Sequence, residues 1–128
     1  MATSASDVAP NVHAFLAALG GAGSVEMFAD PFLFADASGA RPVSRADFLA
    51  TLPRRAQMFA AAGYGAAQLT STDQQRLDEH YLLVRTDWSA PSLTGGEAAE
   101  LSSSYLLRED GASVSVVAYV NHKTVPGM

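Results

Sequence analysis

The chain contains no cysteine and little charge, and most of its charge is negative. Its 128 residues carry 8 lysines and arginines against 13 aspartates and glutamates, for a net charge of −5. The absence of cysteine excludes disulfides and thiolate metal ligands. Arg54-Arg55 is the only adjacent basic pair, whereas binding to nucleic acid or to an anionic membrane needs clustered positive charge. We therefore expect neither of these partners.

Signals for cofactors and metals are missing as well. The glycine-rich GGAGS at 20–24 follows a predicted helix and lacks the Lys-Ser/Thr of a phosphate-binding loop. The three histidines are scattered and do not have the spacing of metal ligands. The sequence therefore predicts no cofactor and no metal. Arg45, Arg54 and Arg55 are most simply interpreted as a solvated helix face.

Long hydrophobic runs are also absent. The first ten residues, MATSASDVAP, contain no basic region and no apolar run of signal-peptide length, so we expect a cytoplasmic protein. Hydrophobic residues make up 48% of the chain and charged residues 16%, which is enough for one buried core. We expect a single domain over residues 1–128, with residues 1–6 disordered. The low charge predicts that part of the surface meets a partner, most simply a second copy in a two-fold dimer.

The first half of the sequence has the periodicity of helices. Ser44 followed by Asp47 resembles a capping box at a helix start. Pro53 falls inside that helix, so we expect a kink or a break there. Asp30-Pro31 ends an earlier short helix, and the apolar FLFAD that follows predicts a buried strand. The elements expected in this half are helices over residues 8–19, 24–28 and 45–62 and a strand over residues 32–36.

Strand periodicity begins after Gly65. The segments alternate polar and apolar residues and are rich in Val, Leu, Tyr, Thr and Ser. Short links such as Asp110-Gly111 are typical of antiparallel hairpins. Helices followed by a meander of strands predict an α+β domain, with the N-terminal helices packed on a curved, mainly antiparallel sheet. The strands are expected over residues 66–77, 80–90, 97–109 and 113–123.

Alternation assigns one set of side chains to the concave face of the sheet, under the helices. Tyr119 falls on the outer face with Leu83 and Val117, where two subunits would meet. One β-bulge would invert part of such an assignment. The concave set is Leu82, Val84, Thr86 and Trp88, then Leu101, Ser103, Tyr105 and Leu107, then Val114, Val116, Ala118, Val120 and His122.

Three stretches resemble the nuclear transport factor 2-like superfamily, in its branch of ketosteroid isomerases and SnoaL-like polyketide cyclases. FADPFLFADASG is similar to the isomerase segment in which an aromatic-Ala-Asp leads into a strand ending in Asp-x-x-Gly. LVRTDW is similar to the pocket strand that ends in Trp, and VVAYV to the final strand. The resemblance implies a cone-shaped, cystatin-like fold that holds a small apolar molecule. The pocket residues that it implies are Val84, Thr86, Trp88, Val116, Ala118 and Val120.

Asp36 lies where the resemblance implies the catalytic base. A carboxylate at the end of an apolar strand should have a raised pKa, which suits a base. Asp-Ala-Ser-Gly is also a plausible turn, in which Asp36 accepts backbone N–H bonds that lower its pKa. His122 is a second candidate acid or base, or simply a solvated histidine. Ser103 and Tyr105 offer hydroxyls to a ligand oxygen, or satisfy each other.

The residues that assist the base in ketosteroid isomerase are changed in this chain. That enzyme pairs its aspartate with a tyrosine and a protonated aspartic acid. Phe15 stands near the place of the tyrosine, and Ser103 near that of the acid. Two functions therefore stay open. One is an isomerase, cyclase or dehydratase that uses Asp36 as a general base, and the other is a non-catalytic ligand-binding or dimerisation module.

Overall fold

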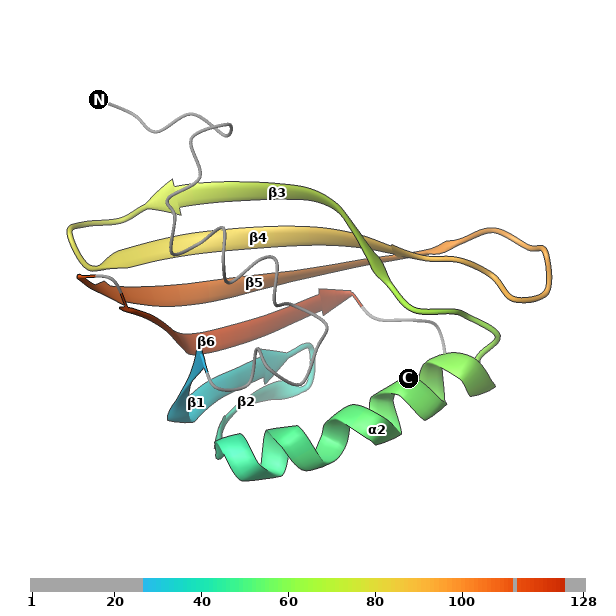
Figure 1. Cartoon of the computed structure of the whole chain (residues 1–128), viewed down its shortest axis with the longest axis horizontal. Helices are drawn as coiled ribbons and strands as arrows, with labels where there is room; N and C mark the ends of the chain where they lie inside the picture. The colour runs from blue at the N-terminus through green and yellow to red at the C-terminus, as the bar shows by residue number, and fades with distance from the viewer. Residues whose placement is uncertain (1–26, 112, 124–128) are drawn as a thin grey trace.

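The computed structural model describes residues 27–111 and 113–123, which form one helix and one six-stranded sheet (Figure 1). The helix predicted over 8–19, Phe15 within it and the start of the short helix at 24 lie outside the described residues. The elements are β1 (Phe28–Asp36), β2 (Gly39–Val43), α2 (Arg45–Ala61), β3 (Gln68–Arg76), β4 (Tyr81–Ala90), β5 (Ala99–Asp110) and β6 (Ser113–Lys123).

The sheet has the strand order β2-β1-β6-β5-β4-β3. Strands β3 to β6 form the predicted antiparallel meander, and β1 pairs in parallel with β6. Figure 1 shows α2 running along one side of this sheet, below β1 and β2 in the view. The α+β architecture and the mainly antiparallel sheet expected from the sequence are confirmed.

A cluster of aromatic side chains packs α2 against the sheet. The ring of Phe32 in β1 lies 4.7 Å from that of Phe28 and 5.2 Å from that of Phe48 in α2, both pairs edge to face. Edge-to-face packing adds to the free energy gained from burying these rings. Leu107 and Val116 belong to the same core cluster and are fully buried. The core therefore lies between the first turn of α2 and the centre of the sheet.

The start of α2 is as predicted, but Pro53 does not interrupt the helix. Ser44 is the N-cap, and its hydroxyl accepts a hydrogen bond of 3.1 Å from the backbone N–H of Asp47. The helix continues through Pro53 to Ala61. Pro53 and Leu49 are both exposed, so the carbonyl group that loses its helical partner lies on the solvent side of the helix. The helix is therefore not broken at Pro53, and the alternative of a kink there stays a prediction.

Two predictions around β1 are also wrong. The strand begins at Phe28, four residues before its expected start, and Asp30-Pro31 lies within β1 with a cis peptide bond and does not end a helix. The hairpin partner β2 was not predicted. Its sequence, GARPV, has no apolar alternation and its first four residues are exposed, because an edge strand of this length buries too little to leave a hydrophobic pattern.

A bulge in β6 changes which of its side chains face the core. Leu107 lies opposite Val116 whereas Leu106 lies opposite Ala118, so Val117 is an extra residue in β6. Side chains directly opposite each other share a face of the sheet. Beyond the bulge Tyr119, opposite Tyr105, turns inward and is buried. Its predicted place on the outer face is wrong.

The same bulge moves Ala118 and Val120 off the concave face. Ala118 lies opposite Leu106, and Val120 lies opposite Ser104, and both partners alternate with the inward-facing residues of β5. Val116 precedes the bulge and keeps its predicted inward orientation in the core. Alternation was therefore right up to the bulge and inverted after it.

Candidate functional site

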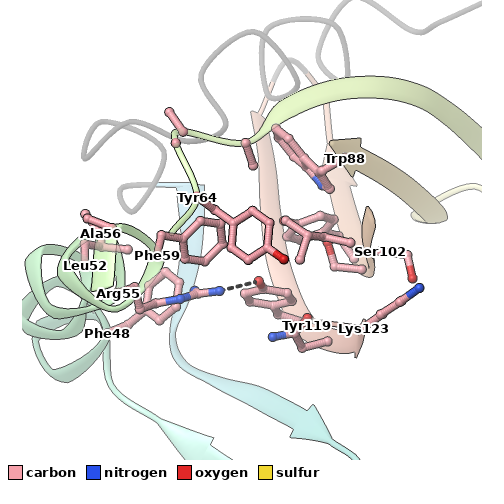
Figure 2. Close-up of a pocket in the computed structure, with 18 of the residues that line it drawn as sticks. Phe48, Leu52, Arg55, Ala56, Phe59, Tyr64, Trp88, Ser102, Tyr119 and Lys123 are labelled. Atoms are coloured by element: carbon pink, nitrogen blue, oxygen red, sulfur yellow. Dashed lines mark hydrogen bonds between the residues drawn. The ribbon is translucent and has the colours of Figure 1, made fainter. Parts of the chain in front are cut away.

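A cavity of about 480 Å³ lies between α2 and the sheet (Figure 2). This volume falls within the usual range for small-molecule sites, roughly 300 to 1,000 Å³. The residues that line it come from β1, from α2 and the segment that follows it, from β4 and the β4–β5 connection, and from β5 and β6. They include Phe48, Leu52, Arg55, Phe59, Tyr64, Trp88, Leu101, Ser102, Ser103, Tyr105, Tyr119, Asn121 and Lys123.

One face of α2 supplies the helical wall of this cavity. Phe48, Leu52, Arg55 and Phe59 follow one another at intervals of three or four residues, which places them along one side of a helix. Arg55 thus shares the apolar face, although its neighbour Arg54 is exposed. Interpreting Arg55 as part of a solvated face is therefore wrong.

The sheet wall carries a connected group of polar side chains. The indole Nε1–H of Trp88 donates to Thr86 Oγ1 at 2.8 Å, and the hydroxyls of Thr86 and Ser103 lie 2.9 Å apart. The hydroxyl of Ser103 also donates to Tyr105 Oη at 3.4 Å. Thr86, Ser103 and Tyr105 are all buried. These groups therefore satisfy one another at the back of the cavity, as buried polar groups usually do.

Two stacked tyrosines connect this group to α2. The rings of Tyr105 and Tyr119 stack with centroids 4.9 Å apart. The guanidinium Nη2 of Arg55 donates to Tyr119 Oη at 3.3 Å, as the dashed line in Figure 2 shows. Burial raises the pKa of Tyr105, so its hydroxyl stays protonated. The pKa of Arg55 is also raised, because its interactions with Tyr119 outweigh the effect of burial.

Asp36 lies outside this cavity, at the end of β1 and next to the turn that leads into β2. Its Oδ1 accepts hydrogen bonds from the backbone N–H of Ser38 at 2.9 Å and from the Ser38 hydroxyl at 2.6 Å. These bonds lower the pKa of Asp36 below its usual 3.8, which contradicts the raised pKa that the base interpretation predicts. The carboxylate borders an adjoining groove of about 720 Å³ between the β1–β2 hairpin and α2, which shares Phe48, Arg55 and Asn121 with the cavity.

The other predicted site residues fall into three groups. Three of them line the cavity, namely Trp88, Ser103 and Tyr105. Thr86 does not line it but is hydrogen-bonded to Trp88 and Ser103. Val84 and Val116 are fully buried in the core and do not line it. Ala118, Val120 and His122 do not line it either. Exposed His122 borders the groove, with its Nε2 2.7 Å from Ser104 Oγ.

Sequence reasoning missed several polar groups in the cavity, among them Arg55, Asn121, Lys123 and the hydroxyl of Tyr119. The helical spacing of Arg55 from Phe48, Leu52 and Phe59 was a usable signal in the sequence. Tyr119 had no comparable signal, because its orientation depends on the bulge in β6.

Neither a metal site nor a membrane span is found in the described part of the chain. No group of three or more His, Cys, Asp or Glu side chains there is placed to hold a metal ion. Within residues 27–111 and 113–123, no helix has both the length and the apolar character needed to cross a membrane.

Comparisons with known proteins find relatives only by structure. No protein-family model matches the sequence, and no curated protein matches it. An NTF2-like protein of unknown function from Shewanella oneidensis matches with a TM-score of 0.65, at 10% identity over 88% of this chain and 97% of its own. An NTF2-like protein with a cystatin-like fold from Novosphingobium aromaticivorans matches with a TM-score of 0.62, at 16% identity over 92% and 79%. The chain has the nuclear transport factor 2-like fold.

A third match carries a small molecule. It is a hypothetical protein from Catenulispora acidiphila with a ketosteroid isomerase-like fold, in complex with trimethylamine, with a TM-score of 0.59 and 16% identity over 91% and 86% of the two chains. The NTF2-like, cystatin-like fold expected from the sequence is thus confirmed. The SnoaL-like branch stays a prediction.

Proposed function

We propose that this NTF2-like protein binds a small, largely apolar molecule in the cavity between α2 and the sheet. The observation that carries the proposal is the cavity of about 480 Å³ and its wall of Phe59, Tyr64, Trp88 and Leu101. Aromatic and aliphatic walls of this kind bind ligands by removing apolar surface from water. The trimethylamine complex of the Catenulispora protein is a small-molecule complex of a similar fold.

The geometry favours binding over proton transfer by Asp36. Among the described residues that line the cavity there is no aspartate, glutamate or histidine. Asp36 is committed to Ser38 and has a lowered pKa, whereas a general base works best with a pKa near the operating pH. Of the two functions left open by the sequence, we therefore propose the ligand-binding module. A two-fold dimer and a cytoplasmic location stay predictions.

The proposal can be tested with a neutral probe and two adjacent alanines of α2. Ala60 lines the cavity and Ala61 does not, and both are exposed. We expect isothermal titration calorimetry to show binding of 2-naphthamide to the protein. Ala60→Phe should weaken that binding at least about tenfold because the new ring occupies the cavity. Ala61→Phe, the matched control, should bind as the unmodified protein does.

Two results would contradict the proposal. One is that neither 2-naphthamide nor its charged analogue 2-naphthoate binds to the protein. The other is equal weakening by the two alanine variants, which would place the probe elsewhere on the surface. Trp88 is the only tryptophan of the chain and lines the cavity, so a change in its fluorescence provides a second readout of binding at this site.

A further inference from the structure

The described residues that line the cavity carry charge of one sign only. Arg55 of α2 and Lys123 at the end of β6 line it, and no carboxylate does so among the described residues. The chain as a whole has the opposite balance, with 13 acidic residues against 8 basic ones. The cavity is therefore a positive site within an acidic protein, a contrast that attracts anions.

Arg55 is hydrogen-bonded to Tyr119, whose ring stacks on Tyr105 of the polar wall. Its Nη2 bonds to Tyr119 Oη at 3.3 Å, and its guanidinium carbon lies 6.0 Å from the centre of the Tyr119 ring. Across residues 27–111 and 113–123, no aspartate or glutamate oxygen lies within 4.0 Å of its nitrogens. Figure 2 shows the side chain reaching from α2 toward Tyr119, with Phe48 and Phe59 on the same helix.

A half-buried cation without a carboxylate partner is an unusual arrangement. Burial removes hydration from the charge, and proteins normally offset that cost with an opposite charge. The guanidinium has five N–H donors in a planar fork, and the Tyr119 hydroxyl is the one hydrogen-bond acceptor it contacts in the described residues. The Arg55 guanidinium is thus able to donate two further hydrogen bonds to a planar oxyanion.

We infer that the molecule bound in the cavity carries a carboxylate or similar oxyanion, which pairs with Arg55 while its apolar body lies against Phe59, Tyr64 and Trp88. This inference rests on the proposed function and adds the class of ligand to it. A carboxylate receives two parallel bonds from a guanidinium, which gives both affinity and orientation. Lys123 is exposed and lies at the end of β6, so it contributes less than the half-buried Arg55.

The test compares 2-naphthoate with 2-naphthamide, which have the same ring system and differ in charge. Isothermal titration calorimetry at pH 7 and low salt should show that the unmodified protein binds 2-naphthoate about 10 to 100 times more tightly. Arg55→Met removes the charge and keeps an unbranched apolar stem, so it should bind both probes equally. Arg54→Met, which changes the exposed neighbouring arginine, should keep the full preference.

The possible outcomes separate this inference from the proposed function. If 2-naphthamide binds as tightly as 2-naphthoate, the inference is overturned and the apolar cavity stands. If neither probe binds, the proposed function fails and the inference fails with it. A preference for 2-naphthoate that survives in both Arg55→Met and Arg55→Gln also overturns the inference. Circular dichroism shows whether each variant is folded, so Arg55→Gln provides the test if Arg55→Met does not fold.

Discussion

Replacing Thr86 with valine tests whether the polar group behind the cavity stabilises the fold. The Thr86 hydroxyl is fully buried and contacts three groups. It accepts from Trp88 Nε1 at 2.8 Å, lies 2.9 Å from Ser103 Oγ and donates to the Ser103 carbonyl oxygen at 3.2 Å. Valine has nearly the same shape as threonine, so Thr86→Val removes these bonds without leaving a large void.

The expected loss follows from the groups left without a partner. Ser103 keeps its bond to Tyr105, but the indole N–H of Trp88 loses its acceptor. The indole is half-buried, but the buried Ser103 also loses its two contacts with the Thr86 hydroxyl. Because unsatisfied buried polar groups cost about 1 to 3 kcal/mol, we expect Thr86→Val to lower the free energy of unfolding by about 2 kcal/mol. Thr86→Ser keeps the hydroxyl and loses one buried methyl group, which costs about 1 kcal/mol. The more apolar variant should therefore be the less stable one.

Urea unfolding followed by the fluorescence of Trp88 measures both variants against the unmodified protein. Thermal unfolding provides a second measure, in which about 2 kcal/mol corresponds to a fall of roughly 8 °C for a domain of this size. If burial of apolar surface were the dominant effect at this position, Thr86→Val would be the more stable variant. That order of stability would refute the role given to the buried hydroxyl.

Two further predictions concern the core and the β1–β2 turn. Leu107→Ala should lower the free energy of unfolding by about 2 to 5 kcal/mol because Leu107 is fully buried. Leu83 is 38% exposed, so Leu83→Ala should cost under about 1 kcal/mol in the same urea assay. Equal losses in the two variants would contradict the assigned core. The lowered pKa of Asp36 means that its carboxylate stabilises the fold above about pH 4 and loses that effect as the pH falls through the folded pKa. Asp36→Asn should thus be less stable than the unmodified protein at pH 7, and the difference in their free energies of unfolding should shrink as the pH falls. The variant should bind 2-naphthamide as tightly as the unmodified protein does. Weaker binding would place Asp36 at the ligand.

The sequence was a good guide where the local pattern decides the structure. The N-cap at Ser44 and the four strands of the meander were predicted because capping residues and alternation act over a few neighbouring positions. Pro53 was misread because its cost depends on whether the freed carbonyl group reaches water, which is a property of the folded surface. The short edge strand β2 left no pattern to read, since only one of its five residues is even half-buried.

The candidate site was predicted less well than the fold, and the residues show why. Alternation and the resemblance together predicted a site on the inner face of β4 and β5, and three of the predicted residues, Trp88, Ser103 and Tyr105, line the cavity there. The resemblance also implied a base at Asp36, but the bonds from Ser38 engage that carboxylate within its own turn. A conserved shape can thus be recognised from a few matching stretches, whereas the chemistry of its cavity depends on single side chains.

The bulges of β6 determine what chemistry the cavity offers. The first, at Val117, turns Tyr119 inward to meet Arg55. Asn121 and Lys123 follow Tyr119 at intervals of two residues, and both line the cavity with it. With strict alternation the same strand would present Ala118, Val120 and His122 there, giving an apolar wall with one titratable group. A one-residue insertion in a strand therefore exchanges a possible acid or base for a tyrosine, an amide and a cation. The preference for an anionic ligand inferred here depends on that exchange, because without the bulge Arg55 would face no hydroxyl from β6.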